Sequence, residues 1–516
     1  MSPFSGKKII LPLLGLLILA CTLLAGFWTS RTHILIPDEL SMVAPGIERI
    51  FHQEPTPSKY PPAAPAFFEL WLRAADHLLD LASRGPDFAF LVARVGNLLL
   101  YSVNLLLFFL VARPYLGGRA AILAVGLFAL NPVVFYSAVH VKTEGLLLAS
   151  ICLCFLASGR ISREPERVSW HALAGASCAL AAATKYNGVL PVAYLAAVLV
   201  SSSNKSGTRP PGQGKALLRG ALVFLVSFLG CLVVLWPDFL HGGEQLGQWA
   251  KDLYFLPGPS WFTAMEGTWV FPYGRFSYPL LFTIPFFMGP LVYLSALAGL
   301  FTRSLPRDAA WIWGLFSALY LLVAFLVTRL QYPPAYLPVA PFLTLLAVSF
   351  WKKLARSPKK IPKATGWFLA GAAILLALVQ YPTMRNISNS VVDATHKARQ
   401  YVEQHGEDNA GLILLMNSSL SLSQGLTPLR LEEGVLNRKP DYILVLDSYL
   451  RNFSKQLNPD YQRQAGLWDK LIQGEAGYEV LWTYPVRYPL QWMNPDPEAD
   501  MTLYFFHRKS RGPKND

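Results

Sequence analysis

Residues 180–192 read LAAATKYNGVLPV, and the way this stretch divides decides the topology of the chain. It lies inside the apolar segment 170–202, which is long enough to form either one long helix or two short ones. Asn187-Gly188 is a turn signal, and a lysine such as Lys185 is costly at the centre of a bilayer. The sequence therefore predicts a break at 185–188, with one short membrane span on each side of it.

The composition of the chain agrees with a membrane-embedded fold. Of the 516 residues, 53% are hydrophobic and 15% are charged, whereas about a quarter of the residues in a soluble domain are charged. The net charge of +13 would favour nucleic-acid binding in a soluble protein. In a membrane protein, Lys and Arg gather instead in the cytoplasmic loops. We therefore expect the lipid bilayer, and no nucleic acid, as a partner.

Eleven apolar segments approach the length of a spanning helix, about 20 residues. If the N-terminus is cytoplasmic, the break at 185–188 keeps the basic loops on one side of the membrane, down to KKLARSPKKIPK at 352–363. A single span would place every later basic loop on the other side, against the positive-inside rule. The sequence thus predicts an all-α polytopic membrane domain of about eleven transmembrane helices, with the C-terminus outside. The segments are roughly 9–29, 88–112, 119–138, 143–159, 170–184, 188–202, 217–236, 278–301, 309–328, 334–351 and 365–382.

Three regions are expected on the outer side of the membrane. The loops 30–87 and 237–277 are long and rich in aromatic residues and proline. From about Arg385, the apolar spans give way to helical and β-like patterns. We predict a transmembrane domain, 1–384, that carries both loops, and a small extracytoplasmic α/β domain, 385–516. Its expected helices are 391–405 and 461–473, and its expected strands are 411–416, 441–447, 478–484 and 501–507.

Charged and aromatic side chains gather at the outer ends of these spans. Each one alone could be a snorkelling side chain or a hydrated loop residue. Carboxylates together with several cations at one interface, however, suit a site that binds an anionic lipid headgroup and performs base chemistry on it. The members of this set are Asp38, Glu39, Lys59, Tyr60, His140, Lys142, Glu144, Lys185, Tyr186, Arg329 and Tyr332.

The second span carries a polar stripe. Arg94, Asn97, Tyr101 and Asn104 recur at spacings of three and four, so they share one face of a helix. Polar residues inside a membrane usually face the bundle interior or a cavity. We expect Asn97 and Asn104 to make interhelical hydrogen bonds. Arg94 lies about 9 Å below the outer rim at the helical rise of 1.5 Å per residue, within reach of a bound phosphate.

Several motifs together resemble a known family. The run IPDEL at 36–40, followed by KYPPAAPAFFELW at 59–71, is similar to the polyprenyl-phosphate-dependent glycosyltransferases of the GT-C fold, which include the protein O-mannosyltransferases and the lipid A aminoarabinose transferases. The resemblance covers the first 200 residues well and the rest loosely. It departs from the family pattern at Tyr332, which is followed by two prolines where the family often has Arg-Tyr before Leu-Pro. Its further motifs are ARVGNLLLYSVN at 93–104, LFALNPVVFYSAVHVKTEGLLLA at 127–149, LAAATKYNGVLPV at 180–192 and TRLQYPPAYLPVAPFLTLL at 328–346.

The resemblance implies a reaction and a role for each site residue. A sugar on a polyprenyl phosphate is transferred to an acceptor hydroxyl on the extracytoplasmic side. Asp38 would be the catalytic base, and Glu39 would orient it, bind sugar hydroxyls or help to hold a metal. Lys59, Lys185 and Arg329 would hold the leaving phosphate. The remaining donor-binding candidates are Tyr60, Arg94, His140, Lys142, Tyr186 and Tyr332.

Several alternatives stay open on the sequence alone. A single base predicts inversion at the anomeric carbon, whereas a carboxylate nucleophile would predict retention. A transporter or flippase of a lipid-linked sugar is the main competing class, although no inverted repeat is visible and the charges gather at one face. A membrane scaffold is a third. The acceptor could be a protein, a lipid or a glycan, and the resemblance favours a bacterial inner membrane.

No metal site or other cofactor is predicted with certainty, and a divalent metal stays open. His and carboxylate ligands are present, but no metal-ligand spacing stands out. The five cysteines all lie in apolar segments, so we expect them to be packed as small core residues and not to form disulfides.

Overall fold

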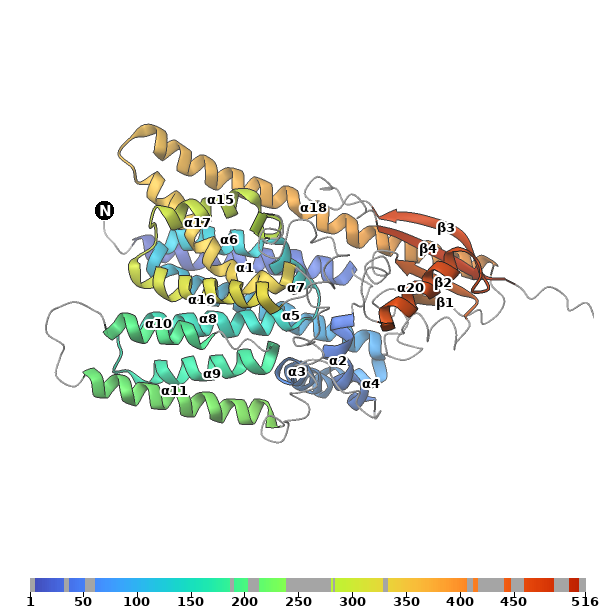
Figure 1. The fold of residues 1–516 in the computed structure, drawn as a ribbon, viewed down its shortest axis with the longest axis horizontal. Coiled ribbons are helices and arrows are strands. Elements are labelled where there is room, and N and C mark those ends of the chain that lie inside the picture. Colours follow the sequence, from blue (N-terminus) through green and yellow to red (C-terminus); the bar gives the residue numbers. More distant parts are fainter. Residues whose placement is uncertain are drawn as a thin grey trace, which may run out of the picture. The chain divides into compact units, whose positions relative to one another are not determined.

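A computed structural model describes most of the chain (Figure 1). The described residues are 5–31, 37–51, 61–185, 190–202, 213–237, 280–281, 284–327, 333–405, 412–415, 440–446, 459–486 and 501–509. The chain divides into two units, which are treated separately below. Unit 1 comprises Met1–Thr29, Ser41–Phe255 and Pro279–Gln380, and unit 2 comprises Ser30–Leu40, Leu256–Tyr278 and Tyr381–Asp516.

Unit 1 is a bundle of helices, and each of the eleven predicted spans contains helical residues. Its helices are α1 (Ser5–Arg31), α2 (Pro37–Ile50), α3 (Ala63–Leu79), α4 (Leu81–Arg84), α5 (Pro86–Leu116), α6 (Gly118–Ala129), α7 (Pro132–Val139), α8 (Thr143–Ile161), α9 (Val168–Lys185), α10 (Pro191–Ser202), α11 (Gln213–Leu235), α14 (Ile284–Met288), α15 (Pro290–Phe301), α16 (Arg307–Val327), the 3₁₀ helix η3 (Pro333–Val339), α17 (Ala340–Ala355) and the first part of α18 (Lys360–His405).

The helices confirm a multi-pass membrane protein. Within the described residues, five helical stretches are long and apolar enough to cross a membrane: Ile10–Phe27, Phe88–Leu116, Thr143–Ile161, Gly214–Leu235 and Tyr336–Ala355. The pair α6 and α7 makes a sixth if it is one broken span. Large apolar side chains such as Leu218 and Leu222 are exposed along α11, as expected of a face that contacts lipid. The full count of eleven spans stays a prediction.

The predicted break between 170 and 202 is confirmed, because α9 ends at Lys185 and α10 begins at Pro191. The segment 119–138, predicted as one span, is instead divided into α6 and α7, which meet at an angle of 66°. Proline lacks an amide hydrogen and disfavours helix before it, so Asn131-Pro132 ends one helix and starts the next.

Two further expectations need correction. The long loop predicted at 30–87 contains three helices, α2, α3 and α4, in its described part. The last span and the polar helix expected at 391–405 are one continuous helix, α18, and the division between the two units falls within it, between Gln380 and Tyr381. The domain boundary between residues 384 and 385 stays a prediction. The polar stretch between the two expected helices contains no glycine to interrupt them. Separate folding of residues 385–516 stays a prediction, and the loop predicted at 237–277 lies almost wholly outside the described residues.

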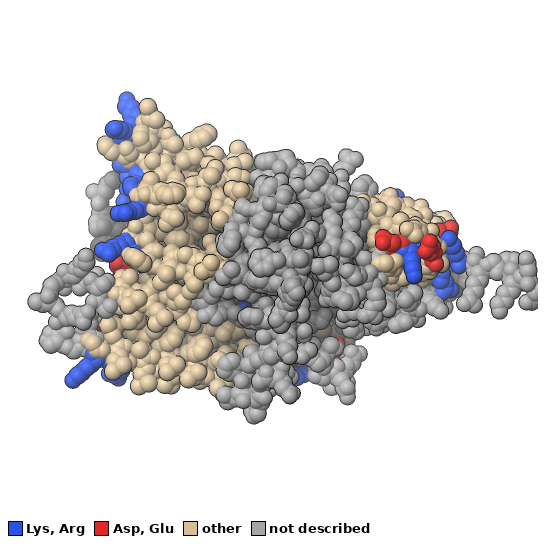
Figure 2. All heavy atoms as spheres, viewed as in Figure 1, with Lys and Arg blue, Asp and Glu red and all other residues tan. Residues whose placement is uncertain are grey.

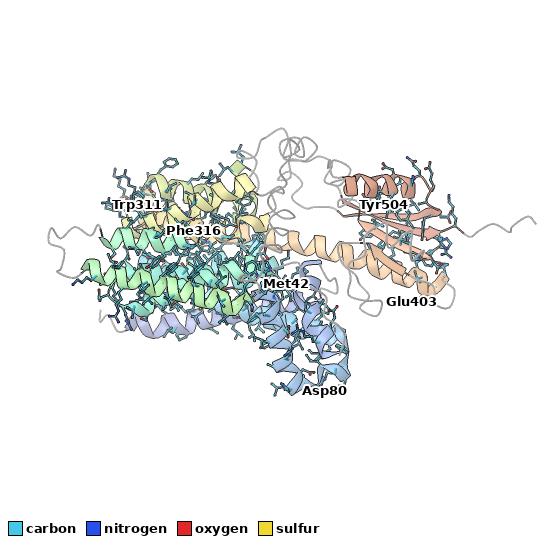
Figure 3. All side chains as sticks on the ribbon, turned by 60° about the horizontal axis from the view of Figure 1, so that its bottom comes forward. Met42, Asp80, Trp311, Phe316, Glu403 and Tyr504 are labelled. Carbon is cyan, nitrogen blue, oxygen red and sulfur yellow. The ribbon has the colours of Figure 1, made fainter. Side chains whose placement is uncertain are left out.

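Glycines and stacked rings set the packing of unit 1. A Cβ on Gly175 of α9 would overlap the backbone of Phe224 on α11, so these two helices approach closely, as small residues allow in membranes. Phe155 of α8 stacks on Trp313 of α16 with ring centroids 3.7 Å apart. Phe316, one turn later, is fully buried in the bundle (Figure 3).

In unit 2, the described strands form one four-stranded sheet in the order β1-β2-β4-β3. β1 (Leu412–Leu415) and β2 (Tyr442–Leu446) are parallel, whereas β4 (Met501–Arg508) runs antiparallel to both β2 and β3 (Tyr478–Val486). The helix α20 (Pro459–Ile472) supplies Leu467, Trp468 and Leu471 to the core of this sheet. The four strands and this helix coincide with the segments expected from the sequence.

Candidate functional site

The connection between α7 and α8 places three ionisable residues in the interior of unit 1. His140, Lys142 and Glu144 alternate along the chain and are 6%, 2% and 4% exposed. Lys142 is the N-cap residue of α8 and has an extended backbone, so the chain changes direction there. The first turn of α8 adds the partial positive charge of a helix N-terminus. This connection is therefore a buried, charged segment and not a hydrated loop.

Glu144 forms an ion pair with Lys185, the last residue of α9. The Lys185 Nζ lies 2.5 Å from Glu144 Oε1. Lys142 acts electrostatically on the same carboxylate, and the Thr143 hydroxyl donates to Glu144 Oε2 at 3.3 Å. Two lysines thus act on one carboxylate, and this group (Lys142, Glu144 and Lys185) is called the lysine cluster below. Buried charges persist only when they are paired and hydrogen-bonded, and Glu144 provides that pairing.

Asn97 of α5 anchors the segment that carries the lysine cluster. Its Nδ2 donates to the backbone carbonyls of Ser137, Ala138 and His140 at 2.8, 2.9 and 2.9 Å. An amide has two hydrogens, so three acceptors require that one hydrogen is shared. The last carbonyls of a helix have no partner inside it, and Asn97 supplies one to the end of α7. The expected interhelical hydrogen bond is confirmed.

Close packing against α5 fixes the start of α8 as well. Asn104 Nδ2 donates to the carbonyl of Gly145 at 2.8 Å, which confirms the second interhelical bond. A Cβ on Gly145 would lie 3.1 Å from Leu100 Cδ2 and 3.2 Å from Asn97 Oδ1. Only a residue without a side chain fits here easily. Arg94, which is buried, lies three residues before Asn97 on the same face of α5.

The structure describes only some of the predicted site residues in full. Lys142 and Lys185 come together around Glu144, and the backbone carbonyl of His140 is one of the three that Asn97 holds. Asp38 and Glu39 occupy the first turn of α2, but their side chains are outside the description. Lys59, Tyr60, Tyr186, Arg329 and Tyr332 lie outside the described residues.

The sequence did not assign a role to two residues that matter here. Glu144 was noted only as a member of the outer set, although a carboxylate two residues after a lysine at a helix start could have suggested a pairing. Asn131 caps α7: its Oδ1 accepts from the amides of Val133 and Val134 at 3.0 and 3.2 Å. An asparagine before proline is a turn signal that would have revealed it.

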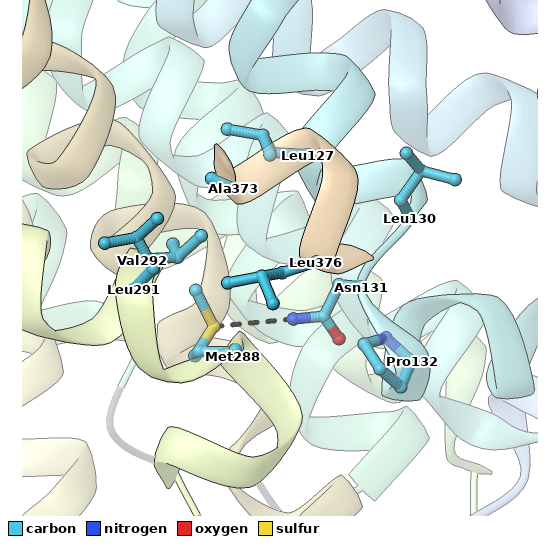
Figure 4. A pocket seen from close by; sticks show the side chains of 10 residues that line it. Leu127, Leu130, Asn131, Pro132, Met288, Leu291, Val292, Ala373 and Leu376 are labelled. Carbon is cyan, nitrogen blue, oxygen red and sulfur yellow. Dashed lines mark hydrogen bonds between the residues drawn. The ribbon is translucent and has the colours of Figure 1, made fainter. Parts of the chain in front are cut away.

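A small pocket lies at the break between α6 and α7 (Figure 4). Its lining is apolar apart from Asn131, whose Nδ2 contacts Met288 Sδ at 3.4 Å. The pocket offers no charge to a headgroup or a sugar. The lining residues are Leu127, Leu130, Asn131, Pro132, Met288, Gly289, Leu291, Val292, Ala373 and Leu376.

Across the described residues, no group of three or more His, Cys, Asp and Glu side chains is arranged to hold a metal ion. The cysteines in this part of the chain are free thiols. Whether a divalent metal takes part therefore stays open.

Comparisons with known proteins match the part of the chain that holds this site. Residues 81–234 match the family model described as dolichyl-phosphate-mannose-protein mannosyltransferase. No match was found among curated proteins.

Solved structures with a similar arrangement include two glycosyltransferases. ArnT from Cupriavidus metallidurans bound to undecaprenyl phosphate is 15% identical, with a TM-score of 0.47, and the match covers 95% of this chain and 97% of that one. The oligosaccharyltransferase AglB from Archaeoglobus fulgidus, in complex with an inhibitory peptide and a dolichol-phosphate, is 13% identical, with a TM-score of 0.46, covering 91% and 73%. The family model, over residues 81–234, confirms the predicted resemblance to the glycosyltransferases that use lipid-phosphate-linked sugars.

Proposed function

We propose that this chain is an integral-membrane glycosyltransferase that moves a sugar from a polyprenyl-phosphate donor to an acceptor hydroxyl. The lysine cluster carries this proposal, because it is a buried group of two lysines and a carboxylate inside the segment that matches the mannosyltransferase family model. Buried lysines around one carboxylate are costly for stability alone. A phosphate that binds them offsets that cost.

The lysine cluster acts on the leaving group. As the bond between the anomeric carbon and the phosphate oxygen breaks, negative charge grows on the lipid phosphate. Lys142 and Lys185 stabilise that charge, and the N-terminus of α8 adds to their effect. Because Asn97 and Glu144 hold these groups before the donor binds, little reorganisation accompanies the reaction.

Asp38 acts on the acceptor. Its carboxylate takes the proton of the acceptor hydroxyl while the oxygen attacks the anomeric carbon, and the lipid phosphate leaves. One displacement of this kind inverts the configuration at that carbon. Glu39 orients the base or binds sugar hydroxyls. The other donor-binding groups of the proposal are Lys59, Tyr60, Arg94, His140, Tyr186, Arg329 and Tyr332.

The reaction takes place on the extracytoplasmic side of a bacterial inner membrane, with a cytoplasmic N-terminus and with residues 385–516 outside. Positive charge at 352–363 supports this orientation through the positive-inside rule. The acceptor is a protein, lipid or glycan hydroxyl.

The test is release of lipid phosphate by the purified full chain in detergent, with a panel of polyprenyl-phosphate sugars and an envelope extract as the source of acceptors. We expect release from one donor by the wild type and a loss of about 10²–10⁴-fold in Asp38→Asn. Asp80→Asn is the matched control: it makes the same change at the exposed end of α3, where the left-handed backbone (φ 49°) suits asparagine.

Each outcome is informative. Equal release by Asp38→Asn and the wild type would remove Asp38 from the role of base. No consumption of any donor by the wild type would contradict the transferase and favour a transporter of lipid-linked sugars.

A further inference from the structure

The connection between α17 and α18 carries an unbalanced positive charge. Six cations fall between residues 352 and 363, and the sequence contains no Asp or Glu between Asp308 and Asp393. Four of the six, in the segment that joins the helices, are exposed and make no ion pair with any described residue: Arg356, Lys359, Lys360 and Lys363. Figure 2 shows blue atoms projecting from the end of unit 1 where α17 passes into α18.

The backbone beneath these cations is held in place. A Cβ on Gly366 of α18 would lie 2.8 Å from the Trp351 carbonyl oxygen and 2.8 Å from the Ala355 amide nitrogen, so the two helix backbones touch. Lys353 Nζ donates to the carbonyl of Thr302 at 2.7 Å. Lys352 Nζ donates to the carbonyl of Tyr115 at 3.3 Å. The connection is therefore a fixed platform that presents its remaining cations outward.

The connection between α8 and α9 differs from the α17–α18 connection, because two of its arginines are neutralised locally. Arg160 and Arg167 lie 3.4 and 3.3 Å from the carboxylate of Glu164. The hydrogen bond from Arg167 lowers the pKa of Glu164. Both connections are exposed to solvent, so solvent exposure alone does not explain why the cations of one are paired with a carboxylate and those of the other are not.

Apolar side chains flank the exposed cations. Ile361, Trp367 and Phe368 are 81%, 66% and 72% exposed. A tryptophan beside basic residues is typical of the membrane interface, where the ring meets the acyl boundary and the cations meet the headgroups. Clusters of four to eight Lys and Arg next to a membrane helix are typical of anionic-lipid binding.

We propose that the connection 352–363 is a docking surface for the headgroups of anionic phospholipids. It is distinct from the lysine cluster and independent of the proposed reaction. Tyr115, to which it is tied, lies 18 residues after Asn97 on α5, about 27 Å along the helix. The two charged sites therefore lie toward opposite ends of α5. Lys352 and Lys353 already tie the connection to Tyr115 and Thr302. Bound lipid would therefore stabilise a region where several helix ends meet.

The test is thermal unfolding of the full chain in detergent micelles with added phosphatidylglycerol or phosphatidylcholine. We expect phosphatidylglycerol to raise the unfolding midpoint, and high salt to remove the effect. Each cation near such a surface contributes about fivefold to affinity. Lys359→Gln with Lys360→Gln should therefore weaken phosphatidylglycerol binding by roughly 25-fold.

The matched control removes two exposed cations from α11 with Lys215→Gln and Arg219→Gln. We expect this control to bind phosphatidylglycerol within about twofold of the wild type, because its two cations lie on another helix, outside the connection 352–363. Lys359→Arg with Lys360→Arg keeps the charge and should bind as the wild type does.

Three results would overturn the proposal. The first is an equal loss of phosphatidylglycerol affinity in the Gln variant and the α11 control. The second is an equal rise of the unfolding midpoint with phosphatidylcholine, and the third is the same rise with inorganic phosphate alone. If the Gln variant does not fold, two measurements still test the headgroup site. They are phosphatidylglycerol binding by the Arg variant and the effect of salt on the unfolding midpoint of the wild type.

Discussion

The two ends of α9 hold two buried polar clusters of different kinds. Near its start, His171 Nδ1 lies 3.0 Å from the hydroxyl of Tyr194, and Nε2 lies 2.9 Å from the carbonyl oxygen of Pro165. At its end, Lys185 pairs with Glu144. The two residues of α9 are 14 positions apart, about 21 Å along the helix.

The difference lies in the kind of contact. A carbonyl can only accept, so Nε2 of His171 carries a hydrogen, and the Tyr194 hydroxyl is the partner of Nδ1. That cluster joins α9 to its neighbours through hydrogen bonds. The lysine cluster instead places an ion pair in the interior of unit 1. A fold that needed only to join α8 and α9 would be served as well by the first kind or by apolar residues, so we connect the buried charges with the proposed donor phosphate.

The largest expected effect comes from removing the cation of the ion pair. Lys185→Met keeps the length of the side chain but removes the cation of the pair, so Glu144 keeps only the electrostatic effect of Lys142. Loss of one member of a buried pair costs about 3–5 kcal/mol, and Lys142 should hold the loss near the lower value. We expect that decrease in the free energy of unfolding in detergent, together with loss of donor turnover, measured as lipid-phosphate release.

A second variant separates the effect of the lysine cluster on stability from its effect on turnover. Glu144→Gln combined with Lys185→Met removes both charges of the ion pair and leaves the charge of Lys142, so it should recover part of the stability of the single variant while turnover stays low. Recovery of turnover as well would make the lysine cluster a structural element like the His171 cluster, and the contrast between the ends of α9 would be lost.

Asn97→Asp should have the next largest effect. The substitution keeps the shape of the side chain and removes the donors that serve Ser137, Ala138 and His140. Leaving buried carbonyls without donors costs about 2–3 kcal/mol in total. We also expect a higher KM for the lipid-linked donor, because the segment that carries Lys142 loses its anchor.

Asn104→Asp is the control for this anchor. Asn104 donates one hydrogen bond of 2.8 Å, to the carbonyl of Gly145, so its loss should cost about a third as much as the loss of the three bonds of Asn97, and KM should change little. Equal shifts in KM for the two variants would mean that α5 acts on the site only through general packing.

Much of the helical framework could be read from the sequence, because apolar length and turn residues act locally. Lys185 before Asn187-Gly188 marked the end of α9 correctly. The four strands of unit 2 followed from short alternating runs. The break at Asn131 was missed, since an apolar run of spanning length outweighed a single Asn-Pro pair, although that pair both caps and starts a helix.

The lysine cluster shows what the sequence leaves out. Lys142 and Lys185 were both expected to serve the phosphate directly, but their relation to Glu144 depends on how α8 packs against α9. Positions 144 and 185 are 41 residues apart, and no local pattern relates them. The same holds for Asn97. The sequence predicted a hydrogen bond between helices, but it did not indicate that the partners are the carbonyls just before Lys142.

Gly220→Ala tests the His171 end. The new methyl group on α11 would overlap the His171 ring. Overpacking of this kind typically costs about 1–3 kcal/mol, and we expect it as a lower unfolding midpoint with an unchanged KM for the donor. Gly230→Ala, on the same helix with nothing within 4 Å of the new Cβ, should instead be neutral or stabilise by up to about 1 kcal/mol. A change in KM with Gly220→Ala would contradict the view that this end is purely structural.

Thr143→Val should have the smallest effect, and it probes the lysine cluster without removing a charge. The Thr143 hydroxyl donates to Glu144 Oε2, whereas Lys185 binds Oε1. At 3.3 Å the bond is long, so its loss should cost about 1 kcal/mol or less. If the cluster serves to hold an anion, however, the freed oxygen can turn toward Lys142 and reduce the charge available to the donor phosphate. The expected result is a stability close to that of the wild type with a KM raised about two- to fivefold, the equivalent of up to ~1 kcal/mol. A loss of stability with no change in KM would instead mean that Thr143 only stabilises the first turn of α8.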